Sequence, residues 1–224
     1  MNETVEQFYA KNAEQGYSDE YNNQHGPRIQ WVIERFGLDK LTNTNVVDVG
    51  CGRGNYFSRM PDPVASGNKY YGLDGAKLGA GAKLKNNFTS IRADFDIPFG
   101  HVLDNEVEID YLIASEVIEH VVGIDNMMLS MKQLVKQNGK ALFTIPHISV
   151  THPVVYPGLM YPEQNFQIFI EQYAWLVEDF DIYPGNWKSC CFLCRNAPMI
   201  EQKPLFPKEE RKFWGNPPSV WANL

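Results

Sequence analysis

Three glycines at alternate positions follow a short apolar run. Residues 46–49 are Val-Val-Asp-Val, and Gly50, Gly52 and Gly54 come next. The β-branched run predicts a buried strand, and the aromatic residues beyond the glycines have helical spacing. Glycine lets the backbone approach a ligand closely, and the free N–H groups at a helix start attract an anionic or polar one. The stretch therefore predicts a nucleotide-type cofactor beyond the end of a central strand.

Acidic side chains close the next two expected strands. Asp74 ends the strand expected over 70–74, and Asp94 ends the strand expected over 89–94. The first could grip both hydroxyls of a ribose, and the second is placed to accept a hydrogen bond from an adenine amino group. The dinucleotide fingerprint G-x-G-x-x-G needs glycine where Asn55 stands, which disfavours a nicotinamide coenzyme.

A second group of reactive side chains follows the strand expected over 109–115. Glu116, Glu119 and His120 are spaced so that a helix would place them on one face. His120 is the leading candidate for a general base, and Glu116 and His147 are further catalytic candidates. The same four side chains could instead hold a divalent metal ion, although we favour a metal-free site.

Strands and helices alternate along the chain, which predicts an α/β fold with a mostly parallel, doubly wound sheet. The expected helices cover residues 26–36, 55–60, 124–135 and 166–180, and Asn138-Gly139 is expected to end the third of them. A terminal antiparallel hairpin is expected over 180–183 and 188–195. We expect one domain over 1–224, with an N-terminal helical lid (1–36), a substrate loop (146–164) and a proline-rich tail (197–224).

Five segments in order, 46–54, 71–74, 92–99, 110–121 and 134–146, resemble the motifs of class I S-adenosylmethionine-dependent methyltransferases. The resemblance implies a Rossmann-like, seven-stranded sheet with a C-terminal antiparallel hairpin, and S-adenosylmethionine as the cofactor. It implies that the methionine end of the cofactor lies against the glycine turn, its ribose at Asp74, and its adenine between Asp94 and Phe95. The full expected cofactor site comprises Arg28, Asp48, Gly50, Cys51, Gly52, Asn55, Tyr56, Asp74, Gly75, Asp94, Phe95, Ser115 and Glu116. Arg28 is included because an N-terminal lid could pair it with the cofactor carboxylate; an ordinary surface helix is the alternative.

The resemblance leaves three functions open. The first is O-methylation of a small polar metabolite, such as a sugar, with His120 as the base. The second is metal-dependent RNA 2′-O-methylation through Glu116, Glu119, His120 and His147, because this set is similar to the metal site of small-RNA 3′-terminal methyltransferases. The third is a scaffold that binds S-adenosylmethionine without turnover.

Composition bears on partners and location. The net charge of −7 argues against a nucleic-acid partner, so a small-molecule acceptor is favoured. No stretch is long and apolar enough to suggest a membrane span or a signal peptide, so we expect a cytoplasmic protein, either a monomer or an oligomer. Three cysteines at 190, 191 and 194 lack a fourth regularly spaced ligand, so we expect buried thiols.

Overall fold

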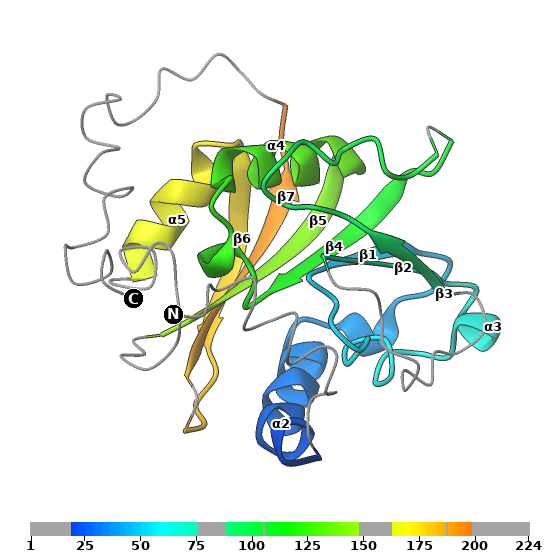
Figure 1. Cartoon of the computed structure of the whole chain (residues 1–224). Helices are drawn as coiled ribbons and strands as arrows, with labels where there is room; N and C mark the ends of the chain where they lie inside the picture. Colours follow the sequence, from blue (N-terminus) through cyan, green and yellow to red (C-terminus); the bar gives the residue numbers. More distant parts are fainter. Residues whose placement is uncertain (1–18, 76–87, 105, 148–162, 187, 199–224) are drawn as a thin grey trace, which may run out of the picture.

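The computed structural model describes residues 19–75, 88–104, 106–147, 163–186 and 188–198. Within these ranges one seven-stranded sheet forms the centre, in the order β3-β2-β1-β4-β5-β7-β6 (Figure 1). The strands are β1 (Asn45–Val49), β2 (Lys69–Asp74), β3 (Phe88–Arg92), β4 (Ile109–Ser115), β5 (Val135–Pro146), β6 (Trp175–Ile182) and β7 (Ser189–Asn196). Pairings among the first five are parallel, and β7 pairs antiparallel with both β5 and β6. The predicted fold class is confirmed.

Helices lie on both faces of this sheet (Figure 1). The helical segments are α2 (Asp19–Arg35), η1 (Leu38–Lys40), α3 (Pro63–Ser66), η2 (Ile118–His120), α4 (Ile124–Leu134) and α5 (Glu163–Glu171), of which η1 and η2 are 3-10 turns. Helices α4 and α5 cover one face, and α2 covers the other. No helix of the described ranges is both long and apolar enough to cross a bilayer.

The burial pattern of the strands explains this arrangement. In β1, Val47 and Val49 face the core under α4 and α5, whereas Val46 faces the core under α2. Successive strand residues point to opposite faces, so an almost continuous apolar run is needed when both faces are covered. The methionines of α4 (127, 128 and 131) are fully buried in the first core, as their helical spacing predicts.

The last expected helix ends earlier than predicted. The helix expected over 166–180 ends at Glu171, and β6 begins at Trp175. Between them Ala174 takes a left-handed φ of 57°, and the Lys132 ammonium binds its carbonyl oxygen. From Trp175 onward, burial tends to alternate with a period near two, which is typical of a strand. The expected hairpin is therefore present but has a longer first strand.

The segments after β1 and α4 also differ from expectation. Residues 52–59 form a series of hydrogen-bonded turns where a helix was expected over 55–60. Asn138-Gly139 does not end α4, because the helix stops at Leu134 and β5 starts at the next residue. Asn138 instead has a φ of 65° within an irregularity of the β4–β5 pairing, where the register shifts between Ile109 and Tyr111.

The strand order reverses direction at β1, which lies between β2 and β4. In open α/β sheets, ligands bind beyond the carboxyl ends of the strands at such a switch point. Val49 pairs with Leu73 of β2 and with Ala114 of β4, so the three strands end at nearly the same level. The fold thus brings the glycine turn, Asp74 and Ser115 to one edge.

Candidate active site

The glycine turn is fixed to the end of β2 by backbone hydrogen bonds. The N–H groups of Gly50 and Cys51 donate to the Leu73 carbonyl over 2.8 and 3.1 Å, and the Gly52 N–H donates to Asp74 Oδ2 over 2.8 Å. All three glycines of the turn have positive φ: 76° at Gly50, 51° at Gly52 and 74° at Gly54. Other residues rarely adopt this conformation, so the glycines are required for the path of the chain.

Gly50 in the turn and Gly72 in the neighbouring β2 leave no room for a side chain. A Cβ at Gly50 would lie 2.5 Å from Val117, which follows β4. A Cβ at Gly72 would lie 2.8 Å from the sulfur of Cys51, so Gly72 makes space for that buried thiol. Gly75 differs, because among the described residues a Cβ there would come within 4 Å only of the Ala93 carbonyl oxygen, at 3.7 Å. The chain is therefore closely packed under the turn.

Two carboxylates near this turn influence each other. Asp48 is only 2% exposed, and its burial raises the pKa of its carboxyl well above the ordinary value, with the negative charge of Asp74 adding to the effect. Burial also raises the pKa of the Cys51 thiol. Negative charge on Asp48 or Cys51 is therefore unfavourable in the folded protein. A ligand that brings hydrogen-bond donors or positive charge to the turn would stabilise it.

The loop after β3 is held against the start of α4. Asp94 is exposed and accepts a hydrogen bond from the Asp96 N–H over 3.0 Å. The Asp96 carboxylate in turn accepts from the Gly123 N–H over 2.6 Å, and the ring of Phe95 contacts that of Phe99 at a centroid distance of 5.2 Å. Asp94 and Phe95 therefore stand on a loop that is braced against the start of α4.

A chain of hydroxyl groups runs beneath the ends of β4 and β5. Thr144 donates to Glu116 Oε1 over 3.1 Å, so its single proton is used there. The Ser115 hydroxyl must then donate to Thr144 Oγ1 over 2.8 Å, and the Tyr56 hydroxyl donates to Ser115 over 3.0 Å. Burial raises the pKa of Tyr56, which keeps its phenol protonated as the first donor. The Glu116 carboxylate can only accept, so it sets the donor and acceptor of every hydrogen bond in this series.

Arg28 from α2 binds the same carboxylate. Its Nη1 lies 2.8 Å from Glu116 Oε1 and donates to Ser189 Oγ over 2.9 Å. The side chains of Arg28 and Glu116 are only 8% and 14% exposed, so this ion pair is well shielded from solvent. The pair connects α2 to the ends of β4 and β7. Arg28 is thus a buried residue at the sheet edge, so an ordinary surface helix, the alternative considered from the sequence, does not describe this part of α2.

Glu116 and His120 do not share a helical face, contrary to the expectation from their spacing. Glu116 has a left-handed φ of 54°, and η2 begins only at Ile118. Such backbone strain at a non-glycine residue is concentrated at functional sites. The fully buried carboxylate of Glu119 lies 3.5 Å from Nε2 of His120, whose side chain is 10% exposed. A carboxylate beside an imidazole can orient the ring and stabilise its protonated form.

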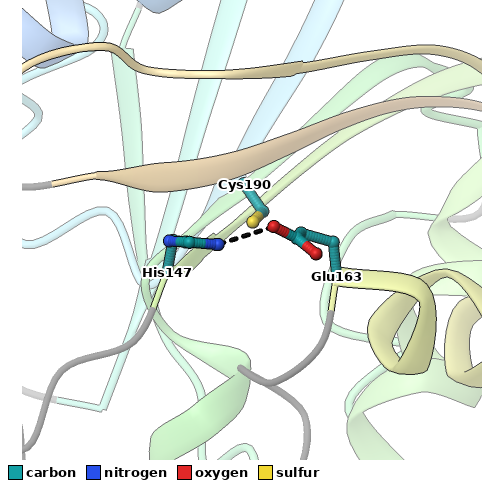
Figure 2. A group of neighbouring side chains, drawn as sticks. All are labelled: His147, Glu163 and Cys190. Carbon is teal, nitrogen blue, oxygen red and sulfur yellow. Dashed lines mark hydrogen bonds and ion pairs between the residues drawn. The ribbon is translucent and has the colours of Figure 1, made fainter.

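His147 lies in a separate cluster. Its Nε2 lies 2.6 Å from Glu163 Oε1, and the Cys190 sulfur is close to both (Figure 2). Within the described ranges, this is the one cluster of three or more potential metal ligands. The four residues considered for an RNA methyltransferase metal site are thus divided, because Glu116 pairs with Arg28 and His147 pairs with Glu163.

The comparisons with known proteins agree with this geometry. A family model described as a methyltransferase domain matches residues 21–183, well over half of the chain. The chain belongs to the methyltransferase domain family. Its family and fold are those of class I S-adenosylmethionine-dependent methyltransferases, with S-adenosylmethionine as cofactor. The positive-φ glycine turn and Asp74 at the end of β2 fit that cofactor.

Individual relatives of this methyltransferase domain are distant. A ubiquinone biosynthesis O-methyltransferase of Rickettsia typhi is 29% identical over 128 residues, which are 52% of this chain and 48% of the relative. The chain spans about half the length of the curated relatives it matches.

Two solved structures share the fold. The N-methyltransferase NodS from Bradyrhizobium japonicum, bound to S-adenosyl-L-homocysteine, has a TM-score of 0.57 at 11% identity, covering 86% of this chain and 98% of NodS. A geranyl diphosphate C-methyltransferase from Streptomyces coelicolor has a TM-score of 0.55 at 9% identity, covering 80% and 82%.

Sequence reasoning missed several residues at this edge of the methyltransferase domain. Thr144 belongs to the hydroxyl chain, Ser189 accepts a hydrogen bond from Arg28, and Glu163 and Cys190 join His147. A hydroxyl within an otherwise apolar strand was the available signal for Thr144. Most of the expected substrate loop (146–164) and of the tail (197–224) lies outside the described residues, as does the start of the expected lid.

Asp48 provides a test of the electrostatics at the turn. The pKa of Asp48 is higher in the folded state than its ordinary value of 3.8. Asp48 therefore stabilises the folded protein below pH 3.8, and this contribution to the free energy of unfolding is lost as the pH rises through the folded-state pKa. We expect Asp48→Asn to raise the free energy of unfolding at pH 7 by about 1 kcal/mol, and by less at pH 4. Urea denaturation at both pH values measures this, with the exposed Asp39→Asn as control. A gain that does not change with pH would contradict the assignment.

The Arg28–Glu116 pair can be tested with variants on one helix. Arg28→Met leaves a shielded carboxylate without its cation and should cost about 3–5 kcal/mol. Arg35→Met removes a pair with Asp179 and Asp181 that is about one-third exposed, and should cost about 1 kcal/mol or less. Adding Glu116→Gln to Arg28→Met should recover much of the loss. Equal costs for the two arginines, or additive costs in the double variant, would rule against a shielded pair.

Proposed function

We propose that this protein transfers the methyl group of S-adenosylmethionine to a hydroxyl oxygen of a small polar molecule. The observation that carries the proposal is the dyad of His120 and the fully buried Glu119, directly after β4. Residues just beyond β4 border the switch point at β1, where the fold family holds its cofactor. A general base at this place is what a hydroxyl acceptor requires and an already nucleophilic acceptor does not.

In the proposed site the cofactor lies across the ends of β1 and β2. Gly50 and Gly52 let it approach the backbone, the Asp74 carboxylate accepts from the ribose hydroxyls, and Asp94 and Phe95 contact the adenine. Asp74 Oδ2 now accepts from the Gly52 N–H, so the same carboxylate joins the ribose position to the turn. Ser115, Glu116, Tyr56 and Arg28 form the floor of the site through their shared hydrogen bonds.

The proposed reaction needs one proton transfer. The acceptor oxygen attacks the methyl carbon, the carbon–sulfur bond breaks, and S-adenosylhomocysteine leaves. The hydroxyl proton passes to the imidazole nitrogen of His120 that does not face Glu119, and the Glu119 carboxylate stabilises the imidazolium. In-line alignment of acceptor and sulfonium is the remaining requirement.

Oxygen as the acceptor atom is supported by the curated relatives, which are named O-methyltransferases. The fold itself does not decide the atom, because the similar structures include an N-methyltransferase and a C-methyltransferase. The separate ion pairs of Glu116 and His147, together with the net charge of −7, favour a small-molecule acceptor over RNA. A sugar-like acceptor fits a polar site.

Replacing His120 tests the proposal. His120→Ala should lower kcat by about 100- to 10,000-fold, because it removes the proton acceptor. Its affinity for S-adenosylhomocysteine, measured by calorimetry, should not change. The assay follows methyl transfer from labelled S-adenosylmethionine to a panel of phenolic and sugar hydroxyls, with mass spectrometry of the product.

The matched control is His101→Ala, which alters an exposed histidine in the loop before β4. It should retain full activity. Methyl transfer to nitrogen or carbon, or full activity in His120→Ala, would refute the proposed chemistry. Tight cofactor binding by a wild-type protein that turns over none of the panel would favour the scaffold function.

A further inference from the structure

Three potential metal ligands outside the proposed methyl-transfer dyad converge at the end of β5. His147 follows β5, Glu163 is the first residue of α5, and Cys190 is the second residue of β7 (Figure 2). One nitrogen, one carboxylate oxygen and one sulfur of these residues all lie within 4.8 Å of one another. They are far apart in sequence, so the tertiary structure is what assembles them.

The sheet fixes two of the three ligands. Cys190 pairs with Ile145 across the antiparallel β5–β7 ladder, and the His147 N–H donates to the Lys188 carbonyl over 2.9 Å. His147 is two residues beyond Ile145, so a continued ladder gives its side chain the same face of the sheet as Cys190. Figure 2 shows the two side chains converging from neighbouring strands, with Glu163 approaching from the helix. A preorganised pair of ligands lowers the entropic cost of binding an ion.

The third ligand can adjust. His147 Nε2 and Glu163 Oε1 are 2.6 Å apart and form a hydrogen bond. Neighbouring ligand atoms around tetrahedral zinc are separated by roughly 3.3–3.8 Å, given bonds of about 2.0–2.3 Å. The Glu163 side chain is 32% exposed, so it can rotate outward by about 1 Å without disturbing the core. Cys190 is buried and His147 is only 18% exposed, which limits competition from water.

We propose that His147, Glu163 and Cys190 bind a zinc(II) ion. Imidazole, carboxylate and thiolate together suit zinc better than magnesium or calcium, which prefer all-oxygen sites. The Cys190 thiol loses its proton to solvent when the ion binds, and the two positive charges are balanced by the thiolate and the carboxylate. Three protein ligands leave a fourth position for water or another small ligand.

The charge environment is consistent with a cation at this place. Burial raises the pKa of the Cys190 thiol to about 12, and the carboxylates of Glu163 and Glu116 add to this effect. This site is distinct from the metal set considered from sequence, since it shares only His147 with that set.

Cobalt(II) is a direct probe, because a cobalt–thiolate bond gives a near-ultraviolet charge-transfer band. The full chain, treated with chelator and reductant, is titrated with cobalt(II). We expect the band to saturate at one equivalent and to disappear when zinc(II) is added. Cys190→Ala should abolish the band, and Glu163→Gln should keep it while weakening cobalt binding at least about 10-fold.

Cys194→Ala is the matched control, because Cys194 is a second buried thiol on the same strand and face. It should leave the band unchanged. The proposal is overturned if the wild-type protein shows no saturable band, or if the band survives Cys190→Ala. Glu163 is partly exposed, so Glu163→Gln remains informative even if Cys190→Ala fails to fold. A cobalt affinity that is unchanged in Glu163→Gln would also overturn the proposal. None of these measurements depends on methyl transfer.

Discussion

The parallel pairing of β1 with both β2 and β4 is the constraint on which the rest of the structure depends. The chain passes from β1 to β2 and β3 on one side and later to β4 and β5 on the other, so the strand order reverses at β1 and the glycine turn emerges between the ends of β2 and β4. The turn can follow this path only with glycine, since Val117 after β4 occupies the space that a Cβ at Gly50 would need. The Gly52 N–H then reaches the carboxylate of Asp74. The sheet order, the conformation of the glycines and the position of Asp74 therefore depend on one another.

Polar groups beneath this edge are arranged so that each is satisfied by the next. The hydroxyls of Tyr56, Ser115 and Thr144 donate in sequence toward Glu116, and Arg28 balances the charge at the end of the chain. Networks of this kind are costly when incomplete and specific when complete. The arrangement links α2 to four parts of the sheet edge, so α2 is part of the floor of the proposed site. A strained Glu116 is the junction of these contacts.

Much of this could be predicted from the sequence, because local patterns determine it. Alternating apolar segments predicted the α/β sheet, and the glycine turn with Asp74 predicted the family and its cofactor. The errors arose where tertiary contacts override periodicity. Lys132 binds the Ala174 carbonyl at the corner where the expected helix gives way to β6. The positive φ of Glu116 separates it from the helical face that its spacing suggested. Contacts across long sequence distances, such as Arg28 with Ser189 or His147 with Cys190, leave no local signal.

Calorimetry with S-adenosylmethionine and S-adenosylhomocysteine tests the central claim, that the glycine turn and Asp74 form the cofactor site, most directly. The account predicts one binding site per folded chain. Asp74→Ala should weaken binding by about 10- to 100-fold, because hydrogen bonds to a charged group contribute about 1.5–3 kcal/mol. Asp39→Ala, an exposed aspartate away from this edge, should bind like the wild type. A folded protein that binds neither compound, or that binds them equally well without the Asp74 carboxylate, would contradict the account.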